Sequence, residues 1–246
     1  MKLVRNSIIL VSLGLVVSLC VLIYLSPPKS HYQYLNFSSN VVIGENYLGI
    51  DVSHYQGEIN WEEVDSVQHD GDSISFVFIK ATEGENLVDP KFELNSEEVK
   101  TTDLKFGFYH FFRPKMSARK QAEHFIQKIM YKEASLKPVL DVEIIEDMDS
   151  QELLDSIDVF MSVAESNLDT EIIIYTYFNF YQDHLKSSLE NDQLIWIANY
   201  NNDYAFDRQE FAQIWQFSDK GTVDGIGTAV DLNIAKKSSW KVIQDE

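Results

Sequence analysis

The sequence KPVLDVE, from Lys137 to Glu143, decides how we interpret the fold of this chain. Its aliphatic residues are strong strand formers, so the stretch predicts a short and buried strand. Asp141 and Glu143 stand two residues apart, and side chains at that spacing leave the same face of a strand, roughly 6.5–7 Å apart. We therefore expect one strand to end by presenting two carboxyl groups together.

Two neighbouring carboxyl groups on a buried strand have a chemical consequence. Burial of an unpaired carboxylate is costly, and two adjacent carboxylates repel each other. The least costly arrangement lets one group keep its proton near neutral pH, as a general acid must. Two ordinary alternatives stay open at this point. The strand either runs out into solvent here, or Asp141 caps the helix that follows.

The rest of the chain supplies further strands and helices in alternation. Hydrophobic runs bounded by turn residues predict eight strands, at Tyr47–Val52, Ser75–Ala81, Phe106–Phe112, Pro138–Glu143, Glu171–Thr176, Leu194–Ala198, Ala212–Phe217 and near Thr228–Leu232. Helical patterns lie between the earlier strands, at Asn60–Gln68, Pro90–Thr101, Ser117–Met130, Asp149–Asn167 and Phe178–Ser188. This alternation favours an α/β barrel of parallel strands that has less helix in its last third.

Reactive side chains of such barrels stand at the carboxyl ends of the strands. The predicted strands place four acidic residues there, together with tyrosine and tryptophan, and we expect them to meet at one mouth. The acidic residues are Asp51, Asp141, Glu143 and Asp231, and the aromatic ones are Tyr109, Tyr175, Trp196 and Trp215. Carboxyl groups beside aromatic platforms are typical of enzymes that cleave sugars.

Several of these residues also have ordinary structural interpretations. Each aromatic residue taken singly fits a hydrophobic core. His54 and His110 fit hydrogen-bonded structural histidines, Lys80 fits a buried ion pair with one of the carboxylates, and Glu83 fits a solvated loop charge. Four carboxylates are able to hold a divalent ion. No pair of histidines at ligand spacing accompanies them, and sugar hydrolysis needs no metal, so we expect neither a metal nor a cofactor.

The N-terminal segment predicts a membrane anchor. Residues Ser7 to Leu25 carry no charge and span about 28 Å as a helix, enough to cross a bilayer core. Lys2 and Arg5 precede this segment, so the N-terminus is expected in the cytoplasm and the rest of the chain outside. A cleaved signal peptide is the rival interpretation, and Cys20 invites a lipoprotein one. We therefore expect an anchor at 1–25 in the cell membrane, crossing it once.

The remainder of the chain divides into a spacer and one domain. Residues 26–46 are polar with a double proline and predict an extracytoplasmic spacer, and residues 47–246 are long enough for one sizeable domain. Cys20 is the only cysteine, so the exported part has no intrachain disulfide. The formal net charge is -19, which becomes -21 when Lys2 and Arg5 are subtracted. Such a surface repels nucleic acid, so no nucleic-acid partner is expected.

An ordered set of motifs resembles the family-25 glycoside hydrolases, the muramidases called Chalaropsis-type lysozymes. The resemblance covers the chain from about Tyr47 to about Ala235. The motifs are GIDVSHYQGEINW at 49–61, FVFIKATEGENLVDPKF at 76–92, KFGFYHFF at 105–112, KPVLDVE at 137–143, LIWIANY at 194–200, IWQF at 214–217 and VDLN at 230–233. Any one of them is a weak signal, and their order makes the set specific.

The resemblance implies a flattened, TIM-like barrel with eight strands and about five helices. It implies cleavage of the β-1,4 bond between N-acetylmuramic acid and N-acetylglucosamine in peptidoglycan. By motif, Glu143 corresponds to the general acid/base, and Asp141 to the group that stabilises positive charge or orients the N-acetyl group. Asp51 and Asp231 correspond to the other two acids of the site. Tyr109 and Tyr175 correspond to positions where family members line the substrate groove, and Trp196 and Trp215 are looser candidates for that groove.

Other functions remain open from the sequence. One is a membrane-anchored scaffold that binds wall glycan without cutting it, and another is a related glycosidase acting on chitin or a capsular glycan. The expected partners are the glycan strands of peptidoglycan and, through the N-terminal helix, the membrane. This arrangement favours local remodelling of the wall by a domain that faces it from the membrane.

Overall fold

The structure is a computed structural model, and it describes residues 46–245 apart from 70–71, 188, 190–191, 202–205 and 207–209. The chain divides into a unit at Met1–Tyr32 and a larger unit at Gln33–Glu246. The expected anchor at 1–25 and nearly all of the expected spacer at 26–46 lie outside the described residues. Within the described ranges, no helix is long and apolar enough to cross a membrane.

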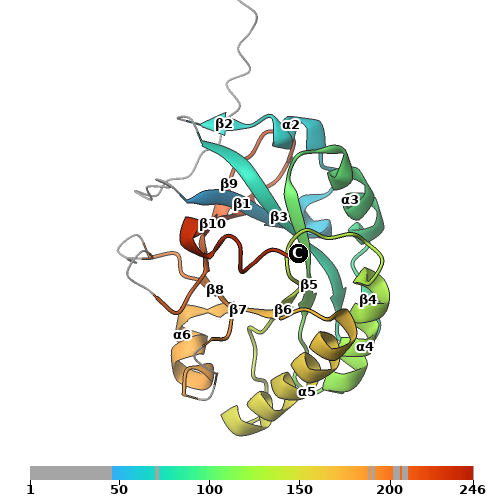
Figure 1. The fold of residues 1–246 in the computed structure, drawn as a ribbon, viewed down its shortest axis with the longest axis vertical. Coiled ribbons are helices and arrows are strands. Elements are labelled where there is room, and N and C mark those ends of the chain that lie inside the picture. Colours follow the sequence, from blue (N-terminus) through green and yellow to red (C-terminus); the bar gives the residue numbers. More distant parts are fainter. Residues whose placement is uncertain are drawn as a thin grey trace, which may run out of the picture. The chain divides into compact units, whose positions relative to one another are not determined.

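Eight strands close into a barrel, as the sequence predicts (Figure 1). They follow the order β1-β3-β5-β6-β7-β8-β9-β10, and the circle closes because β10 pairs with β1. Their bounds are β1 Tyr47–Val52, β3 Asp72–Glu83, β5 Lys105–Phe111, β6 Val139–Asp141, β7 Ile173–Tyr177, β8 Ile195–Ala198, β9 Ile214–Gly221 and β10 Val230–Ala235. Two short strands, β2 Gln68–His69 and β4 Leu87–Val88, pair with the two ends of β3 and were not predicted.

The last strand corrects the expectation of a parallel barrel. The pairs from β1 through β3 to β9 are parallel, but β10 runs antiparallel to both β9 and β1. A parallel return needs a crossover of about a dozen residues or more. The connection from Gly221 to Val230 is shorter than that, so β10 returns in the opposite direction. Asp231 therefore stands at the start of its strand, yet at the same end of the barrel as the carboxyl ends of the parallel strands.

The helices match the five predicted patterns. They are α2 Trp61–Asp65, α3 Phe92–Glu98, α4 Ala118–Ile129, α5 Ser150–Leu168 and α6 Phe178–Phe180, the last continued by a π-helical turn at Tyr181–Leu185. Short 3-10 turns lie at His54–Gln56, Val99–Thr101 and Lys237–Ser239. Helices α3, α4 and α5 cover the outside of the barrel on one side (Figure 1). Asp149, and not Asp141, caps α5 in a capping box with Glu152, so this helix begins at Ser150, after the connecting residues that follow Glu143.

The interior of the barrel is filled by aromatic and branched side chains from alternate strand positions. Phe76 and Phe78 on β3 are fully buried there, and the Phe78 ring lies 4.8 Å from the ring of Trp196 on the opposite strand β8. Gly49 on β1 makes room for this packing, since a Cβ atom there would lie 2.4 Å from the Phe76 ring. A second apolar layer lies between the strands and the outer helices.

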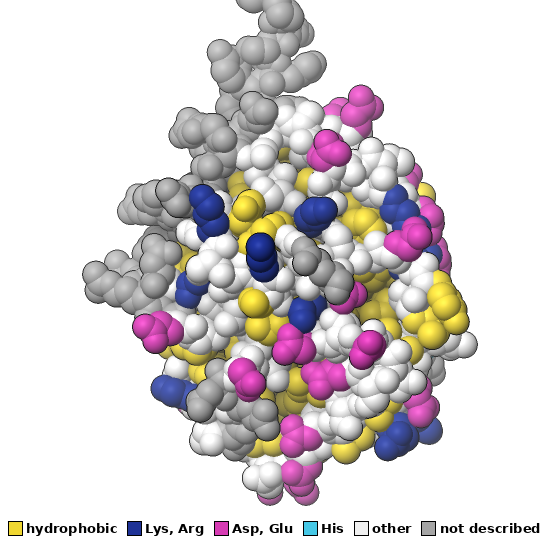
Figure 2. Space-filling view, in the orientation of Figure 1, with side chains coloured by type: hydrophobic (Ala, Val, Ile, Leu, Met, Phe, Trp, Pro, Cys, Tyr) yellow, Lys and Arg dark blue, Asp and Glu magenta, His cyan; other side chains and the backbone are white. Residues whose placement is uncertain are grey.

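The surface carries both signs of charge. Figure 2 shows acidic and basic side chains interspersed with apolar ones on one face of the molecule. Asp and Glu number 39 in the whole chain and Lys and Arg 20, which gives the strong acidic excess.

Candidate active site

A pocket of about 310 Å³ opens at the carboxyl ends of the parallel strands. All four acidic residues named from the sequence line it, and they come from β1, from β6 and its end, and from β10. The lining comprises Asp51, Val52, Ser53, Tyr55, Gln56, Lys80, Tyr109, Phe111, Val139, Asp141, Glu143, Tyr175, Tyr177, Trp196, Tyr200, Gln216, Asp219 and Asp231. The tertiary structure therefore brings together side chains that are up to 180 positions apart in the chain.

Asp141 and Glu143 stand where β6 ends. The strand is shorter than predicted and stops at Asp141, but backbone hydrogen bonds continue, because the Val142 N–H donates to the carbonyl of Tyr175 at 2.9 Å. Asp141 is buried, and its Oδ1 has no hydrogen-bond partner among the described residues. Burial and the neighbouring charges of Glu143 and Asp51 raise the pKa of Asp141 well above its usual value, while Lys80 opposes them.

Glu143 has the titration behaviour of a general acid. Burial raises its pKa to about 7, and the charge of Asp51 adds to this rise. The Tyr175 hydroxyl and the ammonium group of Lys80 act in the opposite direction. A carboxyl group with a pKa near the working pH is able both to give and to take a proton.

Asp51 lies at the centre of a buried hydrogen-bond network. Its Oδ2 accepts from the Gln216 Nε2 at 2.9 Å and from the Asn233 Nδ2 at 2.8 Å. Burial raises the pKa of Asp51, while these two amide donors and a hydrogen bond with Asp231 lower it. The Gln216 Oε1 in turn accepts from the hydroxyl of Tyr175 at 2.9 Å. The amides that surround Asp51 thus keep a buried carboxyl group satisfied.

Asp231 faces Asp51 across the pair β1–β10, where the two are direct neighbours in register. Burial raises the pKa of Asp231 to about 9, and the charges of Asp51 and Asp219 contribute to this rise. These surroundings favour the protonated form of the Asp231 carboxyl group.

The aromatic residues named from the sequence do not share one location. Tyr109, Tyr175 and Trp196 line the pocket. Trp215 does not: it packs in the outer apolar layer beside Phe206, and its Nε1 donates to the carbonyl of Asn199 at 2.7 Å. The structure brings the first three to the carboxyl groups and leaves Trp215 outside.

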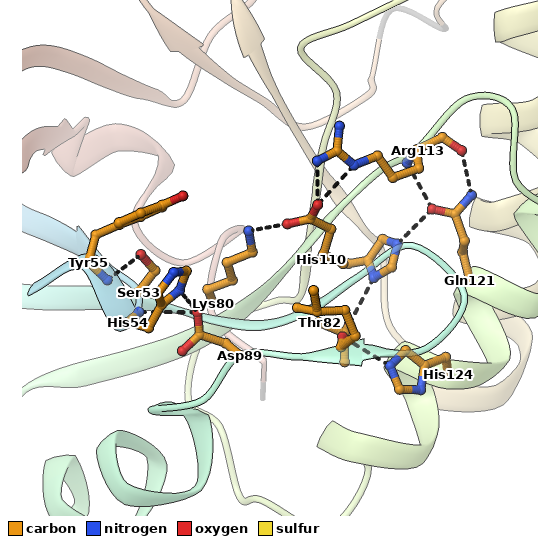
Figure 3. Close-up of polar contacts among 12 residues, drawn as sticks. Ser53, His54, Tyr55, Lys80, Thr82, Asp89, His110, Arg113, Gln121 and His124 are labelled. Carbon is orange, nitrogen blue, oxygen red and sulfur yellow. Dashed lines mark hydrogen bonds and ion pairs between the residues drawn. The ribbon is translucent and has the colours of Figure 1, made fainter. Parts of the chain in front are cut away.

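Lys80 forms an ion pair, but its partner is Glu83 and not one of the four acids. The Lys80 Nζ lies 2.7 Å from the Glu83 Oε2, and the Arg113 Nε donates to the other oxygen of Glu83 at 2.9 Å (Figure 3). Both cations lie 4.8 Å from the centre of the Phe111 ring. Glu83 is therefore not the solvated loop charge expected from the sequence, and the two cations lower its pKa although burial alone would raise it.

Both histidines noted in the sequence are hydrogen-bonded inside the fold, as expected for structural histidines. His110 is fully buried between the Thr82 hydroxyl, at 2.8 Å from Nδ1, and the Gln121 amide oxygen, at 3.1 Å from Nε2 (Figure 3). His54 contacts Asp89 twice, through its backbone N–H at 3.1 Å and through Nδ1 at 2.6 Å. Neither histidine lines the pocket.

Three tyrosines at the pocket were not singled out from the sequence. They are Tyr55, which is 74% exposed, and Tyr177 and Tyr200, which are each 39% exposed. Tyr55 directly follows His54, whose Nδ1 contacts the carboxylate of Asp89. Tyr177 and Tyr200 lie at the carboxyl ends of strands β7 and β8. Their positions were therefore sufficient to place them at the same mouth as the four acidic residues. Tyr55 lies in a short 3-10 turn, where no periodicity indicates the direction of a side chain.

Among the described residues, no group of three or more His, Cys, Asp or Glu side chains is arranged to hold a metal ion. The polar side chains that line the pocket carry carboxyl, amide and hydroxyl groups, together with the ammonium group of Lys80.

Comparisons with known proteins agree with this geometry. The sequence pattern of Glycosyl hydrolases family 25 matches residues 50–226. The chain is 36% identical over 199 residues to the uncharacterized protein YegX of Escherichia coli K12. This match covers 81% of this chain and 73% of that protein. It is 31% identical over 185 residues to an autolytic lysozyme of Clostridium acetobutylicum, covering 75% of this chain and 54% of that enzyme.

A solved structure extends the likeness to three dimensions. The crystal structure of a bacterial lysozyme from Streptomyces coelicolor matches with a TM-score of 0.69 at 26% identity, covering 80% of this chain and 95% of that one. The match includes the closed barrel of eight strands on which the pocket is built. The chain therefore belongs to glycosyl hydrolase family 25, and it is a glycoside hydrolase of the lysozyme class.

Proposed function

We propose that the chain is a peptidoglycan hydrolase that cleaves the β-1,4 bond between N-acetylmuramic acid and N-acetylglucosamine. The observation that carries this proposal is the position of Glu143. It ends the DVE stretch in a pocket that holds four more carboxyl groups, and its pKa is raised to about 7. The lysozyme names of two related proteins, from Clostridium acetobutylicum and Streptomyces globisporus, support peptidoglycan as the substrate.

In the first step, Glu143 donates its proton to the glycosidic oxygen. The bond from that oxygen to the anomeric carbon of the muramic acid breaks, and positive charge develops on the sugar ring. Removing the proton leaves Glu143 as a carboxylate beside this charge. Lys80 and the Tyr175 hydroxyl stabilise the carboxylate form of Glu143, since both lower its pKa.

Asp141 assists at the developing charge. Its buried Oδ1, which has no partner among the described residues, suits an additional donor such as the N–H of the acetamido group. Such a donor stabilises the ionised form of Asp141, and the negative charge then stabilises the cationic sugar or orients the acetamido oxygen toward the anomeric carbon.

The second step has two possible nucleophiles. Either the acetamido oxygen attacks the anomeric carbon and a water opens the resulting ring, or a water attacks directly. In both routes the Glu143 carboxylate takes a proton from the water. The configuration of the new reducing end, measured by NMR in the first seconds of the reaction, separates retention by the acetamido route from inversion by direct attack.

The experiment that tests the activity is a digest of purified peptidoglycan with the purified chain, with the products reduced and analysed by mass spectrometry. We expect muropeptides with N-acetylmuramic acid at the new reducing end. A parallel digest of chitin tests the alternative substrate. If a folded protein yields no products from either polymer but still sediments with peptidoglycan, the chain is a glycan-binding scaffold and the proposal is wrong.

The matched variants are Glu143→Gln and Glu171→Gln. Gln at position 143 keeps the shape of the side chain but has no acidic proton, so we expect at least a 100-fold loss of activity. Glu171 is an exposed residue that pairs with Lys137 on the far side from the pocket, and its change should leave activity unaltered. Equal activity of Glu143→Gln and the wild type would remove Glu143 from the catalytic role.

We also propose that the chain is anchored in the cell membrane by residues 7–25, with the domain outside the cytoplasm facing the wall. The uncharged stretch Ser7–Leu25 behind Lys2 and Arg5 supports this. In cell fractionation the full chain should appear with the membranes and be degraded by protease added to spheroplasts. Recovery mainly from the culture medium would contradict the anchor.

A further inference from the structure

The orientation of one buried amide near the pocket is determined by a tryptophan. Trp196 is 2% exposed, and its Nε1 donates to the Asn233 Oδ1 at 2.9 Å. An indole N–H is a donor and never an acceptor, so the oxygen of the Asn233 amide must face Trp196. Its NH₂ group must then face the other way. There it lies 2.8 Å from the Oδ2 of Asp51.

A second amide acts on the same oxygen. The Gln216 Nε2 donates to the Asp51 Oδ2 at 2.9 Å, while the Gln216 Oε1 accepts from the hydroxyls of Tyr175 at 2.9 Å and Tyr200 at 2.6 Å. The Asp51 Oδ2 thus receives two N–H donors. An oxygen in that position has no place for a proton of its own, and both donors favour the ionised form of Asp51.

The neighbour of Asp51 has the complementary environment. Asp231 stands directly opposite Asp51 in the antiparallel pair β1–β10, and two like charges at such positions destabilise each other. Asp231 receives no hydrogen bond from Gln216 or Asn233, which both donate to Asp51. A proton on Asp51 would have to stand on its Oδ1, and it would weaken the two charge-assisted hydrogen bonds to Oδ2. One proton between the two carboxyl groups is therefore more stable on Asp231.

We propose that Trp196 is a positioning residue, which fixes the Asn233 amide so that Asp51 is the charged member and Asp231 the protonated member of a one-proton carboxyl pair in the active site. Asp231 then faces the pocket as a neutral hydrogen-bond donor, toward Asp51 or toward a sugar oxygen. Trp196 was expected to be a sugar platform, and its burial and its indole contact assign it this different role.

The pair lies in a crowded electrostatic setting. The charged or titratable groups around it are Asp141 on β6 and Glu143 just after it, Lys80 on β3, Asp219 on β9, and the hydroxyls of Tyr109, Tyr175, Tyr177 and Tyr200. Lys80 is the one cation among the described lining residues. A second full charge on Asp231 would raise the pKa of Glu143 further and hold its proton too tightly for transfer. The neutral Asp231 thus keeps Glu143 able to act as an acid.

The test removes the indole donor and keeps the aromatic ring. Trp196→Phe is compared with Trp61→Phe, because Trp61 is equally buried at 3% exposure and its Nε1 makes no hydrogen bond among the described residues. The readout is a ¹³C NMR titration of the aspartate carboxyl carbons in the full chain. Asp51→Asn and Asp231→Asn identify the two signals.

In the wild type we expect the Asp51 carbon to report an ionised group at pH 7 and the Asp231 carbon a protonated one. In Trp196→Phe the Asn233 amide is free to turn, so the Asp51 signal should move toward the protonated form and the apparent pKa values of the pair should shift by about one unit. The alkaline limit of the pH–activity profile should move with them. Trp61→Phe should leave both measurements as in the wild type.

Two results overturn the proposal: a proton found on Asp51 in the wild type, or a Trp196→Phe titration identical to that of the wild type and Trp61→Phe. If Trp196→Phe fails to fold, replacement of Trp196 by benzothienylalanine removes only the N–H and keeps the volume.

The inference rests on the proposed function for its catalytic meaning. However, the NMR titration needs no substrate, so a failed peptidoglycan digest and a failed titration are separate outcomes.

Discussion

The ammonium group of Lys80 lies 2.7 Å from the carboxylate of Glu83, and Lys80 lines a pocket that five other acids also line. Glu83 also binds Arg113, so its carboxylate is shared between two cations, each of which lies 4.8 Å from the centre of the Phe111 ring. Among the described residues that line the pocket, Lys80 is thus a buried cation whose charge is balanced by Glu83 and not by the four acids named from the sequence. This balance helps to set the pKa of Glu143, because Lys80 lowers it.

We predict that Glu83→Gln lowers the alkaline limit of activity. Without the Glu83 charge, Lys80 acts more strongly on Glu143, so the pKa of Glu143 falls and its acidic proton is lost at a lower pH. We expect the alkaline limb of the kcat profile to shift downward by about half a pH unit. Two partly buried charges that line or border one pocket interact by roughly 1 kcal/mol, and part of that interaction appears in the pKa of Glu143.

The control for that prediction is Glu93→Gln. Glu93 also pairs with a lysine, Lys132, at 2.6 Å, but on the outer helices and not at the pocket. The profile of Glu93→Gln should match that of the wild type. Lys80→Met should move the alkaline limb upward, and a shift of both pocket variants in one direction would contradict the electrostatic account.

Glu143 is predicted to reduce the stability of the folded protein at alkaline pH. Its folded pKa of about 7 lies above the ordinary value of 4.5, so its contribution to stability is present below about pH 4.5 and is lost as the pH rises through 7. Glu143→Gln should therefore be more stable than the wild type above pH 8, by on the order of 3 kcal/mol, and nearly equal to it at pH 4.

Urea unfolding at pH 4, 6 and 8 measures this difference. The exposed pair partner Glu171 supplies the control, and Glu171→Gln should show no such increase with pH. A difference between Glu143→Gln and the wild type that stays constant over the three pH values would show that Glu143 titrates as an ordinary glutamate.

His110 is predicted to make the domain sensitive to acid. Burial lowers its pKa to about 3, below the ordinary value of 6.5, so the unfolded chain binds a proton that the folded chain does not. The stability is complete above pH 6.5 and falls by up to about 1.4 kcal/mol per pH unit as the pH decreases toward 3. In His110→Gln this component of the slope should disappear, although the variant starts from a lower stability at pH 7.

The slope is obtained from urea unfolding between pH 7 and pH 4. His184→Gln is the control, since His184 is a partly exposed histidine whose Nδ1 lies 2.8 Å from the hydroxyl of Ser150, and it is not among the groups that shift the pKa of His110. An unchanged acid slope in His110→Gln would mean that other groups cause the acid sensitivity.

Tyr55 is predicted to bind the glycan at the edge of the pocket. Its ring is 74% exposed, and the turn that carries it is held by the two contacts of His54 with Asp89. Stacking of a sugar on this ring should survive in Tyr55→Phe and be lost in Tyr55→Ala. We expect a KM for soluble glycan fragments that is several-fold higher in Tyr55→Ala, with a smaller change in kcat, corresponding to about 1 kcal/mol of contact.

Tyr131→Ala is the matched control for exposure, because Tyr131 is 83% exposed and does not line the pocket. Its KM should stay at the wild-type value. A KM for Tyr55→Ala that equals the value for Tyr131→Ala would exclude Tyr55 from substrate binding.

Local patterns in the sequence were sufficient for the elements and for the acidic quartet. Alternation of apolar runs with turn residues and helical periodicity depends on neighbours within a few positions, and this is why eight strands and five helices were predicted close to their observed bounds. The two carboxyl groups of DVE followed from the two-residue period of a strand. The resemblance of ordered motifs then indicated the family.

The tertiary structure alone decided which neighbours those residues meet. Trp196 and Trp215 have the same local setting, each one residue into its strand, yet β8 pairs with β9 so that Trp196 lies beside Ile214 and Trp215 beside Ile197. A register offset of one residue points the two rings to opposite faces, one to the pocket and one to the outer layer. Similarly, the pairing of β1 with an antiparallel β10 sets Asp231 against Asp51. Strand register and direction depend on contacts between distant parts of the chain, so the opposition of Asp51 and Asp231 is a property of the folded barrel.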